Sequence, residues 1–176
     1  MKFFKKAPET ERSVKSLNTN NDIYLVPAFT GLGAPYWNAN ARGVLSGITR
    51  DTSPKEIIRA TIEAVAYQTY DLFEAMKHDG LRPKLVKVDG GMVMNNWFSQ
   101  FLCDVVNVNV LRPKVQETTA LGAAFMAGLQ IGVYKSLKDI SKKWSLDRKF
   151  KPKMRNQLRN ALVKGWSTAI KRALIV

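Results

Sequence analysis

The chain has 176 residues, 45% of them hydrophobic, and a formal net charge of +14 at pH 7. This length can bury one ordinary hydrophobic core, so a single domain is expected, and no apolar run is long enough to predict a membrane-spanning helix. Cys103 is the one cysteine in the sequence, which excludes an internal disulfide. Near the N-terminus, Lys2, Lys5 and Lys6 are followed by no apolar segment, so no secretory signal is expected and the cytoplasm is the predicted location.

Residues 1–22 are polar and are expected to form a frayed lead-in with a truncated helix over about 9–17. The domain itself is predicted to span residues 23–176. Its first part, residues 23–48, mixes short β segments with glycine and proline turns.

A long helix is predicted over Pro54–His78. Ser53 is a suitable N-cap, Pro54 suits the first turn, and Glu56 falls at the third helical position. His78, near the other end, is expected to complement the helix dipole rather than to take part in chemistry. Small and apolar side chains recur at steps of three and four and predict an interior stripe. The members of this stripe are Ile57, Ala60, Thr61, Ala64, Val65, Gln68 and Leu72.

The most informative stretch is a glycine turn between a predicted strand, Leu85–Val88, and a predicted helix, Asn95–Val106. Gly90 and Gly91 have no Cβ, so the backbone of the turn can approach a ligand closely. The helix start offers N–H groups and a positive dipole end, which suit an anionic or polar ligand. Asn95 can cap this helix or turn its amide toward a purine. A plain strand-turn-helix corner would have the same sequence pattern, so both interpretations stay open.

The rest of the chain continues the alternation of strands and helices that indicates an α/β domain. A strand is predicted over Asn109–Leu111, and Thr118 or Thr119 is predicted to cap the next helix. Two further helices are predicted, over Lys135–Trp144 and Lys153–Leu174. The helix that begins after Thr118 or Thr119 is expected to pack through Leu121, Ala124, Phe125, Gly128 and Leu129. The last predicted helix is expected to pack through Leu158, Leu162, Trp166, Ile170 and Leu174.

Positive charge is concentrated in residues 135–172, which contain thirteen Lys and Arg but only two Asp. This segment therefore contributes a net +11 of the chain's +14. A solvated face of the last helices explains such a block, and we favour this interpretation. The alternative is a binder of anionic polymers. Nucleic acid is not the expected partner, because the block has neither an RNA-binding aromatic motif nor a recognisable DNA-binding fold.

No catalytic residue and no metal site is predicted. Glu63 and Asp71 lie on the long helix, where carboxylates are usually solvated or paired, and Asp89 ends a strand beside the glycine turn, where Asp is common for conformational reasons. The sequence has no Walker A loop, no histidine-rich metal motif and no Ser-His-Asp set. Cys103 is expected to be a small buried side chain rather than a nucleophile.

Three motifs carry a resemblance to a known family. The segment GVLSGITRDTSPKEIIRATIE, residues 43–63, resembles the second signature of the FGGY carbohydrate kinases. Val26–Trp37 and Thr118–Ala124 are similar to the glycerol kinases within that family. The resemblance extends from about Ile23 to the final predicted helix.

The resemblance implies the ribonuclease-H-like ATPase fold of actin and hexokinase, in the form of the C-terminal domain of the FGGY kinases. In that fold the C-terminal domain holds adenosine. Gly91 matches the glycine whose backbone lies against the nucleotide, Gly90 belongs to the same turn, and Asn95 matches the asparagine that contacts the nucleotide near the adenine. ATP or ADP is therefore the expected cofactor, with Mg²⁺ in the intact enzyme.

The resemblance also implies that most of a kinase lies outside this sequence. The phosphate-binding loops, the polyol-binding residues and the catalytic aspartate of the family precede the matched region. The chain is thus expected to be the ATP-binding C-terminal half of an enzyme that phosphorylates glycerol, inactive alone, with glycerol bound only by the complete enzyme. The expected partners are ATP, a separately encoded N-terminal half, and further copies of the chain. The alternative is a non-catalytic relic or binding module that retains the fold.

Overall fold

Helices and strands alternate along the chain in the computed structural model, which describes residues 8–175. In chain order the elements are α1 (Pro8–Lys15), β1 (Tyr24–Val26), β2 (Val44–Ser46), α2 (Pro54–His78), β3 (Leu85–Lys87), the 3₁₀ helix η1 (Gly91–Met94), α3 (Asn96–Val106), β4 (Asn109–Pro113), α4 (Thr118–Gln130), α5 (Leu137–Ser141), β5 (Leu146–Phe150) and α6 (Asn156–Ala173).

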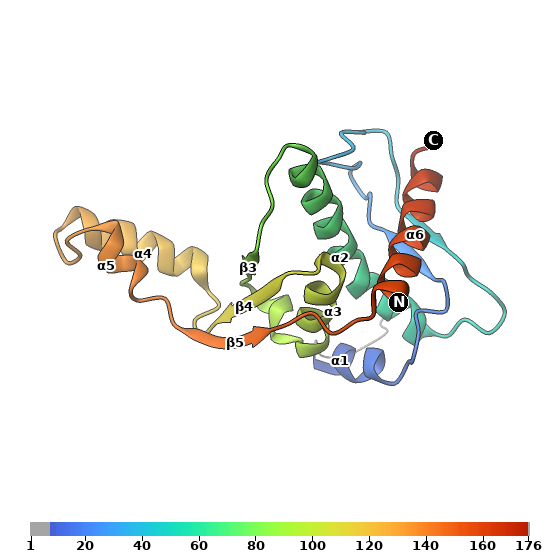
Figure 1. Ribbon diagram of the computed structural model, residues 1–176, viewed down its shortest axis with the longest axis horizontal. Coiled ribbons are helices and arrows are strands. Elements are labelled where there is room, and N and C mark those ends of the chain that lie inside the picture. The colour runs from blue at the N-terminus through green and yellow to red at the C-terminus, as the bar shows by residue number, and fades with distance from the viewer. Residues whose placement is uncertain (1–7, 176) are drawn as a thin grey trace.

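The helices α1, α2, α3 and α6 form a body that also contains the hairpin of β1 and β2, while α4 and α5 project from it (Figure 1). A three-stranded sheet with the order β3-β4-β5 joins the two parts. Strand β3 pairs with β4 in parallel, and β5 pairs with β4 antiparallel. None of the helices within residues 8–175 combines the length and the apolar character that a membrane span requires.

Helix α2 begins as its sequence predicts. Ser53 is the N-cap, the Glu56 carboxylate accepts a hydrogen bond from the Ser53 N–H at 3.0 Å, and the Ser53 hydroxyl accepts one from the Lys55 N–H at 3.3 Å. This reciprocal capping satisfies N–H groups that have no partner inside the helix. At the other end His78 is exposed in the last turn.

The predicted interior stripe of α2 is only partly correct. Ala60 and Ala64 are buried, but Thr61, Val65 and Leu72 are exposed. The buried face is rotated toward residues that the pattern did not select, namely Ile58, Ile62, Ala66, Tyr67 and Phe73. Helix α2 therefore carries two apolar faces, and within residues 8–175 only one of them is covered.

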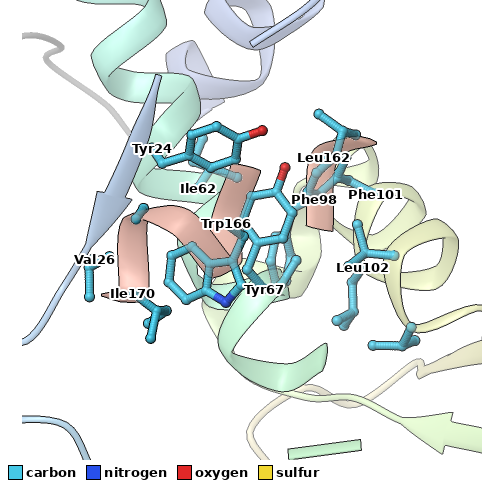
Figure 2. Close-up of a cluster of buried hydrophobic side chains, with 14 of the residues drawn as sticks. Tyr24, Val26, Ile62, Tyr67, Phe98, Phe101, Leu102, Leu162, Trp166 and Ile170 are labelled. Carbon is cyan, nitrogen blue, oxygen red and sulfur yellow. The ribbon is translucent and has the colours of Figure 1, made fainter. Parts of the chain in front are cut away.

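Stacked aromatic rings form the centre of the core (Figure 2). The Tyr67 ring lies parallel to the Trp166 ring, with centroids 5.2 Å apart, and it meets the edge of Phe101 at 5.5 Å. Offset and edge contacts of this kind add to the stabilisation that burial of the rings provides. Tyr24 from β1 completes the cluster and lies so close to α6 that a Cβ at Gly165 would be 2.2 Å from its hydroxyl. Glycine is thus required at that position of α6.

Helix α6 follows its predicted pattern with one exception. Leu162, Trp166 and Ile170 are buried, whereas Leu158 in the first turn is half exposed, with 51% of its surface accessible. The Trp166 indole N–H donates to the Asp71 carboxylate at 2.8 Å, which gives the buried ring a polar partner on α2.

The lead-in is more tightly packed than expected. Val14 of α1 is completely buried, and the Arg59 guanidinium donates to the Leu17 carbonyl at 2.7 Å. These contacts make the described part of the lead-in, residues 8–22, a component of the body rather than a frayed extension. Residues 1–7, with Lys2, Lys5 and Lys6, lie outside the described residues.

The segment after β4 differs most from the prediction. Glu117 and not a threonine occupies the N-cap of α4, and of its predicted packed face only Gly128 is buried. The helix predicted over residues 135–144 shrinks to the five residues of α5. The strand β5 was missed because its sequence, LDRKF, is mostly charged and only Phe150 is buried.

Burial raises the pKa of the Asp71 carboxyl above its usual value, although hydrogen bonds from Trp166 and Tyr36 oppose the shift. A carboxyl with a raised pKa binds its proton more tightly in the folded chain than in the unfolded chain, so protonation stabilises the fold. This contribution to the free energy of unfolding is lost as the pH rises from the pKa of the unfolded chain through that of the folded chain. We therefore expect Asp71→Asn, which is always neutral, to gain stability relative to the wild type as the pH rises above about 4, the usual pKa of an unfolded Asp carboxyl. Urea unfolding at a series of pH values measures the difference, with Asp51→Asn at an exposed loop position as the matched control. A difference in unfolding free energy between Asp71→Asn and the wild type that stays constant with pH would contradict the prediction.

Candidate functional site

The glycine turn lies between the end of β3 and the start of α3, as predicted. Gly90 has φ 85° and ψ 173°, a backbone conformation that favours glycine, and Gly91 opens the single turn of η1. A Cβ built at Gly90 or Gly91 meets no atom within 4 Å. The turn therefore presents bare backbone to open space, which a flat ligand can approach.

Hydrogen bonds from two neighbouring segments hold the turn in place. The Gly90 N–H donates to the Gln116 carbonyl at 3.2 Å. On the other side, the carbonyl of Val93 accepts from the Ser99 hydroxyl at 2.9 Å and from the Arg112 guanidinium at 2.7 Å. The turn is thus held on one side by the segment after β4 and on the other by α3 and β4.

Arg112 is a residue that sequence reasoning missed as part of this region. It is buried, its Nε lies 2.8 Å from the Asp147 carboxylate, and its guanidinium lies 5.6 Å from the centre of the Phe150 ring. Both partners come from β5, the strand that the sequence did not predict. With β5 unrecognised, no local signal in the sequence connected Arg112 to the turn around Val93.

Asn95 fulfils one of its two predicted roles. Its Oδ1 accepts a hydrogen bond from the Phe98 N–H at 3.0 Å, so it is the N-cap of α3. Its Nδ2 lies 3.5 Å from the Thr10 hydroxyl oxygen of α1. The cap thus uses the amide oxygen, and the amide NH₂ group is the part that a purine would contact.

The N-terminus of α3 is not a set of free donors, contrary to expectation. Asn95 accepts from the Phe98 N–H, and the Glu11 carboxylate of α1 accepts from the Asn96 N–H at 3.4 Å. An acidic side chain is favourable at a positive helix end. The Glu11 carboxylate also pairs with the Lys15 ammonium at 2.5 Å, so what it takes from an anionic ligand at this helix start is the Asn96 N–H.

Two cavities flank the region, but neither is lined by the glycine turn or by Asn95. The first, of about 550 Å³, lies between the segment before β1 and helices α3 and α6, where Trp97 and Asp104 are among its walls. The second, of about 320 Å³, lies between the sheet and α4, where the Lys87 ammonium sits 4.3 Å from the centre of the Trp144 ring. Pockets for small ligands usually enclose most of the ligand surface, so the turn alone would provide at most one wall of such a site.

The acidic residues considered from the sequence do not gather at the turn. Asp89 is exposed beside it, whereas Asp71 belongs to the core contact with Trp166 and Glu63 is completely buried next to Arg59, with 2.6 Å between the charged groups. Burial raises the pKa of Glu63, and the Arg59 charge opposes that shift. No group of three or more His, Cys, Asp or Glu able to hold a metal ion occurs within residues 8–175.

Cys103 is a buried residue of α3, as predicted. Its thiol donates to the Val108 carbonyl at 3.1 Å, and burial raises its pKa to about 11. A thiol of this kind is a poor nucleophile at neutral pH.

Glycerol kinases from several bacteria are similar to almost the whole chain. Glycerol kinase 1 of Pseudomonas aeruginosa is 51% identical over 172 residues, and the glycerol kinase of Alkaliphilus oremlandii is 49% identical over 175 residues. These alignments cover 98% and 99% of this chain but 35% of each relative. The chain thus spans about a third of the length of the relatives that it matches.

Solved structures agree with this similarity. A crystal structure of Plasmodium falciparum glycerol kinase with ADP superposes with a TM-score of 0.85 at 32% identity, covering 99% of this chain and 35% of that protein. A xylulose kinase from Lactobacillus acidophilus shares the fold, with a TM-score of 0.76 at 23% identity over 97% of this chain and 35% of its own. The predicted α/β fold is confirmed. Residues 4–131 match the C-terminal domain of the FGGY family of carbohydrate kinases, and the chain belongs to that family.

Proposed function

We propose that this chain is the adenosine-binding C-terminal part of a glycerol kinase, which phosphorylates glycerol with ATP only when the rest of the enzyme is present. The observation that carries the proposal is the bare glycine turn at Gly90 and Gly91 beside the amide of Asn95, in a chain 51% identical to a glycerol kinase. ADP in the Plasmodium falciparum structure supports a nucleotide as the ligand.

The geometry favours recognition of adenosine over recognition of phosphate. The turn has room for a ring against its backbone, and the Asn95 NH₂ group can donate to a purine nitrogen. Glu11 already occupies the Asn96 N–H at the start of α3. Donors for the phosphates, ligands for Mg²⁺ and the residues that orient glycerol are accordingly assigned to the two thirds of a glycerol kinase that this chain does not cover. The cytoplasmic location expected from the sequence stays a prediction.

Nucleotide binding tests the proposal directly. With one wall of the site present, we expect a dissociation constant near 1 mM, about −4 kcal/mol. Adenosine-induced NMR shift changes should map to residues 90–98. Gly91→Val should weaken binding about tenfold or more, because a branched side chain would occupy the space that the ligand needs.

The variants at Asn95 must separate ligand contact from helix capping. Asn95→Ala would remove the cap and cost about 1 kcal/mol of stability. Asn95→Ser keeps an oxygen for the Phe98 N–H and removes the NH₂ group with its 3.5 Å contact to Thr10, so we expect weaker adenosine binding with a smaller loss of stability than Asn95→Ala causes. If shifts map far from the turn, or if Gly91→Val and Asn95→Ser bind like the wild type, the turn is only a strand-helix corner and the proposal fails.

The charge of Glu11 predicts how affinity depends on the phosphates. Adenosine, ADP and ATP should bind the wild type almost equally, because Glu11 and Asn95 already accept from the Asn96 and Phe98 N–H groups that a phosphate would use. Glu11→Gln should raise the affinity for ATP a few-fold and leave that for adenosine unchanged. Titration calorimetry or NMR titration gives both constants, and Asp51→Asn changes the net charge equally at an exposed loop position as a control. An equal increase in ATP affinity for Glu11→Gln and Asp51→Asn would contradict a local effect of the Glu11 charge.

The chain alone should not phosphorylate glycerol. Its described residues bring no carboxylate cluster to the glycine turn, and phosphoryl transfer requires a carboxylate to orient the attacking hydroxyl as well as donors around the phosphates. The measurement is glycerol 3-phosphate formation from ATP and glycerol, with a Gly91→Val preparation purified in parallel to reveal contaminating host kinase. Turnover above that background, abolished by Gly91→Val, would show that the chain is a complete enzyme.

A further inference from the structure

The positively charged block of residues 135–172 divides into parts with different surroundings. Around α5, the Lys142 ammonium lies 3.3 Å from the Asp139 carboxylate. On α6, Arg159 lines a hollow that also contains the carboxylate of Glu74. These cations share their surroundings with a negative charge, whereas the cations of β5 and of the segment after it do not.

A hollow of about 270 Å³ lies beside β5, and we call it the β5 hollow. Its walls are Gln100, Arg148, Lys149, Phe150, Lys151 and Lys153. The four cations among them are exposed, and within residues 8–175 none of them forms an ion pair. Positive charges that surround one space repel one another, so an anion in that space would remove a repulsion as well as gain an attraction.

Two carboxylates in this region have other partners. Asp147 of β5 pairs with Arg112 at 2.8 Å, so these two charges cancel. The Oδ1 atom of Asp104 on α3 accepts from the N–H groups of Lys153 and Met154 at 2.6 and 3.2 Å. Even if the charge of Asp104 is subtracted in full, the four cations of the β5 hollow leave a local charge of +3.

Helix α3 holds the backbone that carries two of these cations. The Gln100 side-chain NH₂ group donates to the Lys151 carbonyl at 2.9 Å, and Asp104 accepts from the Lys153 N–H. Pro152, between the two lysines, restricts the backbone further. The segment between β5 and α6 therefore runs along α3 (Figure 1), and Lys151 and Lys153 project from a held backbone.

Arg148 has two contacts that orient its guanidinium. The Nη1 group donates to the Asn96 side-chain oxygen at 3.0 Å, and the guanidinium lies 5.2 Å from the centre of the Phe150 ring. The hydrogen bond to Asn96 uses one of the five N–H groups of the guanidinium. The planar fork of an oriented Arg matches two oxygens of a phosphate, and orientation reduces the entropy lost on binding.

We propose that the β5 hollow binds a phosphate group with about two negative charges, carried either by a small molecule in solution or by the headgroup of a lipid. A phosphate monoester at neutral pH has this charge and offers three acceptor oxygens, which suits one Arg fork and several Lys point charges. A single-stranded nucleic acid is a poorer occupant, because such chains bind by stacking on exposed aromatic rings and Phe150 is buried. The residues Gly90, Gly91 and Asn95 do not line the β5 hollow, so the inference does not depend on the proposed function.

The experiment titrates the full 176-residue chain with inorganic phosphate and with pyrophosphate, followed by NMR. We expect the amide signals of residues 148–154 and of the Gln100 side chain to shift, and those of residues 90–98 to stay. Pyrophosphate should bind about tenfold more tightly than phosphate, because it carries more charge. An increase in ionic strength from about 0.05 M to about 0.2 M should weaken both affinities several-fold.

Two double variants separate a local site from general attraction by a basic chain. Lys151→Gln with Lys153→Gln keeps the backbone contacts to α3 and should weaken pyrophosphate binding about tenfold or more. Its melting temperature at low salt should be no lower than that of the wild type, because a repulsion is removed. Lys164→Gln with Lys171→Gln removes two charges from exposed positions of α6 outside the β5 hollow, and it should stay within about twofold of the wild type.

Arg148→Lys tests the role of the guanidinium fork. It keeps the positive charge and loses the paired N–H groups, so we expect pyrophosphate to bind a few-fold more weakly. Adenosine-induced shifts of each variant, measured separately, report on the glycine turn alone. They therefore distinguish failure of the proposed function from failure of the β5 hollow.

Vesicles identify which source supplies the phosphate. Cosedimentation is measured with phosphatidylcholine vesicles that contain phosphatidic acid, and with phosphatidylcholine alone. Shifts with free phosphates and no cosedimentation support a small molecule. Cosedimentation only with phosphatidic acid, lost in the Lys151→Gln and Lys153→Gln variant, supports a lipid headgroup.

Three results would overturn the inference. The first is that neither free phosphates nor phosphatidic acid vesicles bind. The second is an equal loss of affinity in the two double variants, which would show that only the total charge matters. The third is retention on single-stranded DNA that the Lys151→Gln and Lys153→Gln variant abolishes, in a chain that binds no phosphate probe, which would make a nucleic acid the occupant.

Discussion

The stack of Tyr67 on Trp166 is the contact on which the rest of this structure depends. It joins α2 near the middle of the chain to α6 at its end, and the indole N–H extends the contact to Asp71. Tyr67 also donates to the buried Glu63 at 3.1 Å, and Glu63 in turn pairs with Arg59, which reaches back to Leu17 of the lead-in. Segments far apart in the sequence are thereby held in one body. The same core reaches the sheet through Val110 of β4 and Phe150 of β5, whereas β3 and α4 are mostly exposed, so the described chain is well packed on one side and open on the other.

The candidate site lies at the border between these two sides. Its helix, α3, belongs to the packed body through Phe98, Phe101 and Leu102, whereas its strand, β3, is at the exposed edge of the sheet. The turn between them is fixed from both directions, by Gln116 after β4 and by the buried Arg112. A turn held in this way can present one wall of a ligand site without the opposite wall. For this reason we expect weak but correctly placed adenosine binding, and not the loss of the site, when the rest of a kinase is absent.

Local signals were sufficient wherever the structure depends on local chemistry. The capping of α2 by Ser53 and Glu56, the glycine turn, and the cap at Asn95 could all be predicted from neighbouring residues. The errors arose where a residue's environment depends on distant segments. Strand β5 exists because LDRKF pairs with β4 and Asp147 meets Arg112, and neither contact leaves a periodic pattern in a charged stretch. The helix patterns around Leu72 and Ala124 correctly indicate apolar faces, but in the described residues no partner covers them. The roles of Gly90, Gly91 and Asn95 toward a nucleotide stay predictions.

The distribution of charge around α3 suggests how the two parts of such an enzyme divide recognition of a nucleotide. At the start of this helix, Glu11 accepts from the Asn96 N–H, and Arg148 of β5 donates to the Asn96 side chain at 3.0 Å. Arg148 and Arg112 both lie against Phe150, and Arg112 is neutralised by Asp147. Of these two residues only Arg148 belongs to the basic block of residues 135–172, and it is engaged with the start of α3, whereas Arg112 holds the turn. A nucleotide at this turn would meet bare backbone, an amide and a carboxylate, and we propose that this set would select the uncharged base and ribose and leave the phosphates to cations from elsewhere.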